Sequence, residues 1–180
     1  MIDAFWAKWR VPSSGYKKVG VVDNSDAVNP QLIANYFIQS VDTDSGDNIT
    51  HLKLQKLMYF AQAWYLANIN KVLFDEDMQA WAHGPVTPSI WHKYKENRWG
   101  SLSLDDDAVL PDKKILPFLQ LIWERYGQFS PKKLEQMTHN DGPWKDVRGG
   151  RPQEARCTDA IPKQRIRDYY AKKINKNWNG

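Results

Sequence analysis

The sequence predicts a mainly α-helical fold: a compact single domain of several helices around a central hydrophobic helix at about residues 50–69. Apolar residues lie on nearly every side of that segment, although the whole chain is polar, with a mean hydropathy of −0.67. Helix-capping residues followed by proline recur along the chain. Strand-like sequence is confined to one small extended element near 78–83, which argues against a fold based on a sheet.

The stretch "THLKLQKLMYFAQAWYLA" has the composition expected of the central helix. Thr50 is the expected N-cap, and Ile49 and Leu54 have the spacing of a hydrophobic staple. A helix that is apolar nearly all round lies in the middle of a helical protein. We therefore expect the other helices to pack around it. Its apolar residues are Leu54, Leu57, Met58, Ala61 and Tyr65 on one face and Tyr59, Phe60, Trp64 and Leu66 on the others.

Further helices are expected before and after the central one. Most begin at a capping residue or at a proline, whose missing N–H costs no bond in the first turn. Gly127 is the expected end of the helix that contains Pro117. The stretch "MQAWAHG" is expected to be extended, with a turn at Gly84-Pro85. The expected helix starts are Asn29-Pro30, Thr87-Pro88, Ile115, Ser130-Pro131, the "NDGPW" stretch and Pro162.

The chain is expected to consist of three segments. Residues 1–28 form a partly irregular leader, residues 29–150 the helical domain, and residues 151–180 a basic C-terminal segment with one helix. Three aromatic residues of the leader, at positions 5, 6 and 9, can lie on one side of a short amphipathic turn. Exposed, they would form a docking site. We favour the alternative that they fold back on the domain, because exposed aromatic clusters are rare in monomers.

Positive charge is concentrated near the C-terminus. Residues 145–180 contain ten Lys and Arg against four Asp and Glu, a net charge of +6, while the rest of the chain carries −2. Such a segment can bind nucleic acid or an acidic protein surface. A solvated basic helix is the simpler interpretation, because charged side chains are mostly exposed. A DNA-binding regulator that uses this segment is the alternative function.

The composition also limits the class of protein. Cys157 is the sole cysteine, so neither an intramolecular disulfide nor a thiolate metal cluster can form. No apolar run approaches the ~20 residues of a membrane span, and the N-terminus lacks the apolar core of a signal peptide. We therefore expect a cytoplasmic protein with no membrane contact. No Gly-rich phosphate loop follows a strand, and no cofactor is expected.

Residues that could carry catalysis are sparse. The imidazoles His51, His83, His92 and His139 show no spacing typical of a metal site. His139 lies two residues from Asp141, and the two could form an acid/base pair. Asn and Asp before Gly-Pro more often supply turn and capping hydrogen bonds. We therefore expect no enzyme, and a hydrolase that uses His83 or His139 with Asp141 is the least favoured alternative.

Three stretches of the chain together resemble one protein family. They are "THLKLQKLMYFAQAWYLA", "LFDEDMQAWAHGPVTPSIWHKYK" and "SPKKLEQMTHNDGPWKDVR". The order and spacing of three motifs in these stretches resemble the Panacea domain. The motifs are Leu-Gln-Lys-Leu-x-Tyr-x-Ala-Gln, then Ala-Trp-x-x-Gly-Pro-Val, then Thr-His-x-x-x-Pro-Trp. This domain is also called the SocA-like antitoxin or phage-associated protein domain. The similarity covers about residues 30–148, some two thirds of the chain.

The resemblance implies a compact α-helical domain that has no enzyme activity of its own. Members of the family occur in bacteria, prophages and mobile elements, generally beside a toxin gene. They neutralise the toxin by direct binding, and some of them present it to an ATP-dependent protease. The resemblance therefore implies the antitoxin of a type II toxin–antitoxin system, with a cognate toxin protein as the partner. A protease and nucleic acid are further partners to be tested.

The motifs also suggest roles for individual residues. We expect the motif positions to be structural and the toxin contacts to lie mainly outside the shared core, because local differences in contacts set specificity. The motif residues expected to be structural are Leu54, Leu57, Tyr59, Ala61, Trp64, Trp81, Gly84, Pro85, His139, Pro143 and Trp144. The residues predicted to bind the partner are Phe5, Trp6, Trp9, His83, Lys163, Arg167 and Lys173.

Overall fold

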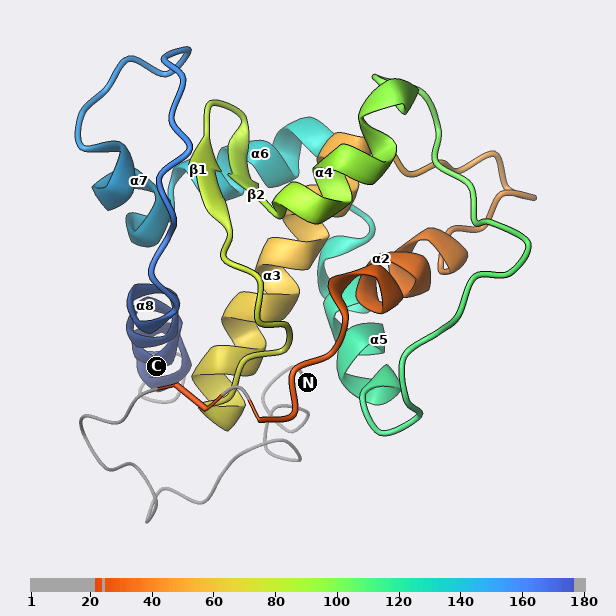
Figure 1. Ribbon diagram of the computed structural model, residues 1–180, viewed down its shortest axis with the longest axis horizontal. Coiled ribbons are helices and arrows are strands. Elements are labelled where there is room, and N and C mark those ends of the chain that lie inside the picture. Colours follow the sequence, from red (N-terminus) through yellow and green to blue (C-terminus); the bar gives the residue numbers. More distant parts are fainter. Residues whose placement is uncertain (1–21, 24, 177–180) are drawn as a thin grey trace.

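The protein is described by a computed structural model that covers residues 22, 23 and 25–176 (Figure 1). It confirms a mainly α-helical single domain with one small extended element. The helices are α2 (Pro30–Gln39), α3 (His51–Ile69), α4 (Pro88–Tyr94), α5 (Leu116–Tyr126), α6 (Pro131–His139), α7 (Gly142–Arg148) and α8 (Lys163–Lys176), with a short 3-10 helix η3 (Lys95–Asn97) after α4. The strands are β1 (Gln79–Trp81) and β2 (Gly84–Val86).

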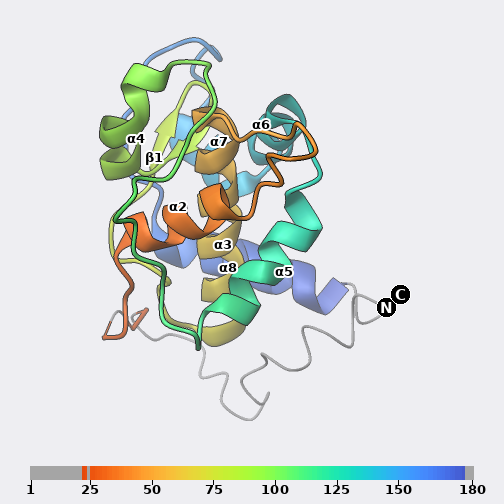
Figure 2. The same ribbon diagram turned by 90° about the vertical axis from the view of Figure 1, so that its right-hand side faces the viewer.

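Helix α3 runs through the middle of the molecule, as the sequence predicts. Thr50 caps its start, where the Thr50 hydroxyl accepts a hydrogen bond from the Lys53 N–H at 3.3 Å. Asn70 ends the helix in the left-handed conformation, at φ 58°. Helices α2 and α5 pack on one side of α3 and α8 packs on the opposite side (Figures 1 and 2). The central helix is therefore covered along most of its length.

Helix α8 completes the hydrophobic core. Ile166 and Tyr170 of this helix are 1% and 0% exposed. The Tyr170 ring packs edge-on against Trp64 of α3, with 5.0 Å between the ring centroids, and against Tyr59 at 6.1 Å. Edge-to-face aromatic pairs add stability beyond the area that they bury. The helix of the basic C-terminal segment is thus part of the same core as α3.

Two glutamines of α3 bind the chain segments around it. The Gln62 side-chain oxygen accepts hydrogen bonds from the N–H groups of Leu73 (2.8 Å) and Phe74 (3.3 Å), and its nitrogen donates to the Phe74 carbonyl (2.9 Å). The Gln55 oxygen accepts from the Thr87 N–H at 2.7 Å. Buried backbone groups outside regular structure need such partners. These contacts position the segment between α3 and β1 and the start of α4.

The extended element is an antiparallel hairpin in which Ala80 pairs with Pro85 and Trp81 with Gly84. The turn predicted at Gly84-Pro85 is therefore placed wrongly, because both residues belong to β2 and the turn lies at Ala82–His83. Pro85 cannot donate a backbone hydrogen bond, a loss that a strand tolerates at the edge of a sheet. On its other side, β1 receives the segment around residue 160, since the Ala80 N–H donates to the Asp159 carbonyl at 3.0 Å.

Most of the expected caps form as the sequence predicts. The side chains of Asn29 and Ser130 accept hydrogen bonds from the N–H groups of Gln31 and Lys133, at 2.9 and 3.2 Å. Thr87 stands at the N-cap of α4, but its hydroxyl makes no capping bond. Among the described residues, no helix combines the length and apolar character needed to cross a bilayer.

We predict that Gln62→Leu destabilises the protein by roughly 2–4 kcal/mol, because it leaves the buried backbone groups of two residues without partners. Urea unfolding followed by circular dichroism measures this change. Gln120→Leu is the control, since Gln120 is exposed and bonds only to the neighbouring Glu124 side chain. Equal midpoints for the two variants would contradict the role assigned to Gln62.

Candidate functional site

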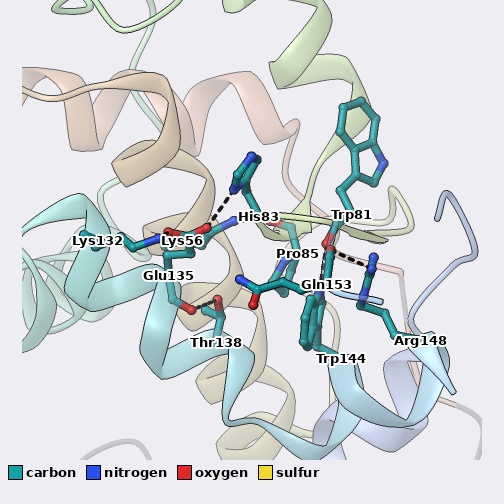
Figure 3. A network of polar contacts seen from close by, with 10 residues as sticks. All are labelled: Lys56, Trp81, His83, Pro85, Lys132, Glu135, Thr138, Trp144, Arg148 and Gln153. Atoms are coloured by element: carbon teal, nitrogen blue, oxygen red, sulfur yellow. Dashed lines mark hydrogen bonds and ion pairs between the residues drawn. The ribbon is translucent and has the colours of Figure 1, made fainter. Parts of the chain in front are cut away.

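The three motif stretches of the sequence meet around the β1–β2 hairpin (Figure 3). Lys56 comes from α3, Pro85 from β2, Thr138 from α6 and Trp144 from α7. The residue that brings them together is Gly84. A Cβ atom at this position would lie 2.7 Å from Thr138 Oγ1 and 2.9 Å from Lys56 Nζ, and the backbone φ is +98°. A glycine is required here by both the backbone conformation and the close approach.

Lys56 is a fully buried lysine beneath the hairpin. It is 0% exposed, and its Nζ donates a hydrogen bond to the Pro85 carbonyl at 3.0 Å. Burial lowers the pKa of Lys56 to about 7, and the negative charge of Glu135 offsets only part of this effect. Since charged groups are costly to bury, the ammonium is kept inside by the carbonyl and by the nearby carboxylate.

Glu135 links α6 to the turn of the hairpin. Its carboxylate, 2% exposed, accepts a hydrogen bond from His83 Nδ1 at 2.8 Å and forms an ion pair with Lys132 Nζ at 2.7 Å. Burial by itself raises the pKa of Glu135, but the hydrogen bonds from Lys132 and His83 hold it below its usual value. The His83 side chain is 57% exposed and is held at the turn by this contact.

Trp144 and Arg148 of α7 hold the other strand of the hairpin. The Trp144 ring stacks on His139, with 4.3 Å between the ring centroids, and its Nε1 donates to the Trp81 carbonyl at 3.0 Å. Arg148, which is 3% exposed, donates to the Ala80 carbonyl at 3.1 Å. Its other terminal nitrogen donates to three carbonyls of the following loop, those of Pro152, Gln153 and Ala155.

The buried Arg148 was not found by sequence reasoning, because its partners are backbone carbonyls that carry no sequence signal. A second feature of this cluster is the imidazole of His139, whose Nε2 is buried and has no hydrogen-bond partner among the described residues. Burial lowers the pKa of His139. The ring therefore serves the cluster as a neutral stacking surface for Trp144.

Asp141 does not pair with either of the histidines proposed for catalysis. Its carboxylate accepts hydrogen bonds from Tyr59 Oη at 3.2 Å, from Tyr170 Oη, and from Lys173 Nζ at 2.9 Å. It lies 4% exposed between α3 and α8. Burial, together with this carboxylate, raises the pKa of Tyr59 well above its usual value. The acid/base pair suggested by the sequence is therefore not assembled, because His83 binds Glu135 and His139 stacks on Trp144.

A pocket of about 290 Å³ opens at the surface beside this cluster. It is lined by His51, Leu52, Gln55, Lys56, Trp81, His83, Val86, Trp91, Lys95, Arg98 and Trp99. None of these residues, all in the described part of the chain, is acidic. We call this site the tryptophan pocket. It joins two of the motif stretches to the segment from α4 to Trp99, and Trp99 is 76% exposed.

The basic residues predicted to bind the partner on α8 have partners within the fold. Lys163 pairs with Asp77, Arg167 with Asp168 at 2.9 Å, and Lys173 with Asp141 at 2.9 Å. Their role in partner binding stays a prediction. The three predicted aromatic contacts of the leader, Phe5, Trp6 and Trp9, lie outside the described residues.

The motif residues predicted to be structural occupy the core or its edge. The α3 residues of this set are 0% exposed except for Trp64 at 4%, which donates its Nε1–H to Tyr126 Oη at 2.7 Å. Trp144 is 7% exposed. Trp81 is half-buried and lies on the wall of the tryptophan pocket, so a motif position also contributes to the surface. Trp81 therefore has a place in the pocket wall in addition to the structural role that the sequence predicts.

The fold and the site define a small helical protein in which the motif residues build a rigid hairpin beside an aromatic pocket. Residues 54–145 match the family described as "Antitoxin SocA-like, Panacea domain", and the chain belongs to this family. A relative is the protein "Antitoxin SocA" of Caulobacter vibrioides (strain NA1000 / CB15N), which is 28% identical over 115 residues. That match covers 57% of this chain and 61% of the relative, less than two thirds of its length. No solved structure is significantly similar.

We predict that Gly84→Ala destabilises the protein by roughly 2–5 kcal/mol, because strain at positive φ adds to overpacking against Lys56 and Thr138. Gly46→Ala is the matched control, since Gly46 also has a positive φ, +82°, but nothing lies within 4 Å of its Cβ position. Thermal and urea unfolding of both variants measure the difference. If Gly84→Ala lowers the free energy of unfolding no more than Gly46→Ala does, the close approach to Lys56 and Thr138 does not contribute to the destabilisation.

We predict that the stability of the wild-type protein rises with pH between about 7 and 9. The folded chain releases the Lys56 proton near pH 7, whereas the unfolded chain keeps it until about pH 10.4. Because the unfolded state then binds more protons, the free energy of unfolding increases by up to about 1.4 kcal/mol per pH unit. Lys56→Met removes this contribution. Urea unfolding of the wild type and of Lys56→Met from pH 6 to 9 tests this prediction. If the free energy of unfolding depends on pH in the same way in both proteins, Lys56 is not the source of the pH dependence.

Proposed function

We propose that this protein is the antitoxin of a type II toxin–antitoxin system and neutralises a cognate toxin by binding it directly. The observation that carries the proposal is the family match over residues 54–145, which includes the hairpin and most of each of the three motif stretches. The name of the Caulobacter relative, Antitoxin SocA, supports the same role. A cytoplasmic location belongs to this proposal, because the antitoxin has to meet the toxin before the toxin acts.

The surface next to the hairpin is suited to binding another protein. Protein interfaces are rich in tryptophan and arginine, and a few such residues supply most of the binding energy. The tryptophan pocket brings Trp81, Trp91, Trp99 and Arg98 together on one part of the surface. The hairpin and α6 support this region through buried contacts, so little order has to be gained on binding.

Delivery of the bound toxin to an ATP-dependent protease is an extension of the same proposal. It requires a surface for the toxin and a second one for the protease. DNA binding through α8 receives less support, because four basic residues of this helix form ion pairs with aspartates of the fold. These residues are Lys163, Arg165, Arg167 and Lys173. Phosphate binding depends on cations that are free to replace counterions.

The proposal predicts that the protein protects cells from the product of the neighbouring reading frame in its native locus. Expression of that frame alone should stop growth, and coexpression of this protein should restore it. The two proteins should also copurify. The control is Gln62→Leu, which should protect less because it folds less stably. The antitoxin function would be contradicted if the product of the neighbouring frame does not stop growth. It would also be contradicted if that product stays toxic when this protein is coexpressed in folded form at a high level.

A further inference from the structure

The tryptophan pocket combines aromatic rings at the surface with positively charged side chains. Trp81 and Trp91 lie with their ring centroids 5.1 Å apart at an interplanar angle of 58°. Trp99 is the most exposed large hydrophobic residue of the described chain, at 76%. An exposed apolar group of this size typically marks an interaction site when others lie beside it.

The cations at the mouth of the pocket lack acidic partners. Lys95 Nζ lies 5.7 Å from the centroid of the Trp91 ring, and Arg98 follows with a positive φ of 48°. Neither side chain forms an ion pair within the described part of the chain, in contrast to Lys163, Arg167 and Lys173 of α8. Their positive potential is therefore available to an acidic partner.

The base of the pocket is held in place by buried hydrogen bonds. Since the Gln55 oxygen accepts from the Thr87 N–H, the Gln55 amide nitrogen faces His51 Nε2, at 3.1 Å. His51 Nε2 must accept this bond, so the imidazole is neutral. Burial lowers the pKa of His51 to about 4, which agrees with that assignment. The positive charge of the pocket thus comes mainly from Lys95 and Arg98 on its rim.

We propose that the tryptophan pocket binds a short segment of the toxin in which an acidic side chain stands next to an aromatic or aliphatic one. This inference rests on the proposed antitoxin function. The apolar side chain would pack against Trp81, Trp91 and Trp99, and the carboxylate would pair with Lys95 or Arg98. The volume of about 290 Å³ is close to the lower end of ligand pockets, ~300–1,000 Å³, and suits a short anchoring segment.

A single-stranded nucleic acid is the competing occupant, because bases also stack on aromatic rings beside cations. Such binding requires a positively charged groove that follows the backbone over several nucleotides. Here the free cations are confined to the rim next to η3, and the remaining walls are mainly apolar. The distribution of charge therefore favours an acidic protein segment.

The test compares binding of the copurified toxin to pocket variants and matched surface variants. Trp99→Ala and Lys95→Glu alter the exposed rim and leave the core intact. Val109→Ala and Lys113→Glu are the controls, since Val109 is 63% exposed and Lys113 is exposed near the α5 end of the connection between η3 and α5, and neither lines the pocket. Each pocket variant should weaken toxin binding at least about tenfold by calorimetry, as expected of a hot-spot residue, and should protect growth less. The controls should bind as the wild type does.

The outcomes separate this inference from the function on which it rests. If the wild type neutralises the toxin and both pocket variants bind it within twofold of the wild-type affinity, the pocket is not the docking site and the antitoxin function stands. If the wild type neither binds nor protects, both proposals fail. Charge reversal of an acidic toxin residue that restores binding to Lys95→Glu would support the proposed pairing. If the wild type binds a fluorescent oligonucleotide, and Trp99→Ala abolishes this binding but leaves toxin binding unchanged, the pocket binds nucleic acid. That result would overturn the proposal of a toxin segment in the pocket.

Discussion

The burial of polar side chains along α3 is the constraint on which the rest of the structure depends. A helix covered on nearly all sides places Gln55, Lys56 and Gln62 inside the protein, where each needs a partner. Their partners are backbone groups of residues 73–74 and 85–87. The path of the chain after α3, and with it the position of the hairpin, follows from these few hydrogen bonds.

Two groups of basic residues, one on α8 and one at the tryptophan pocket, lie in different electrostatic environments. On α8, Lys163, Arg167 and Lys173 pair with carboxylates of the fold, and Lys173 also lies over the rings of Tyr169 and Tyr170. At the tryptophan pocket, Lys95 and Arg98 have no such partners in the part of the chain that the structure describes. The net charge of a segment therefore does not show where a partner binds, because charges that satisfy each other attract little from outside.

The part of the chain that defines the family is smaller than the part that makes the core. The match spans residues 54–145, whereas α2 and α8 lie outside it and still pack against α3. Asp141 connects the two regions, because its carboxylate binds Tyr59 of α3 and both Tyr170 and Lys173 of α8. A residue that suggested acid/base chemistry in the sequence thus joins the helices of the core.

The sequence by itself determined the helices, their caps and the burial of the central segment. These features depend on local signals: a capping side chain two or three residues from its partner, a proline in a first turn, and an apolar pattern on all sides of one helix. It also determined that the motif stretches belong together. It placed the hairpin turn at the wrong residues, because Gly84 is required for its close approach to Lys56 and Thr138 and not for a turn.

Only the tertiary structure decided which residues share a site. Tyr59 and Asp141 are 82 positions apart, and Trp144 reaches the carbonyl of Trp81 across 63 positions. The tryptophan pocket likewise combines α3, the hairpin and the segment after α4. Such pairings have no signature in a single sequence, because the distance between two residues far apart in the chain depends on the packing of everything between them.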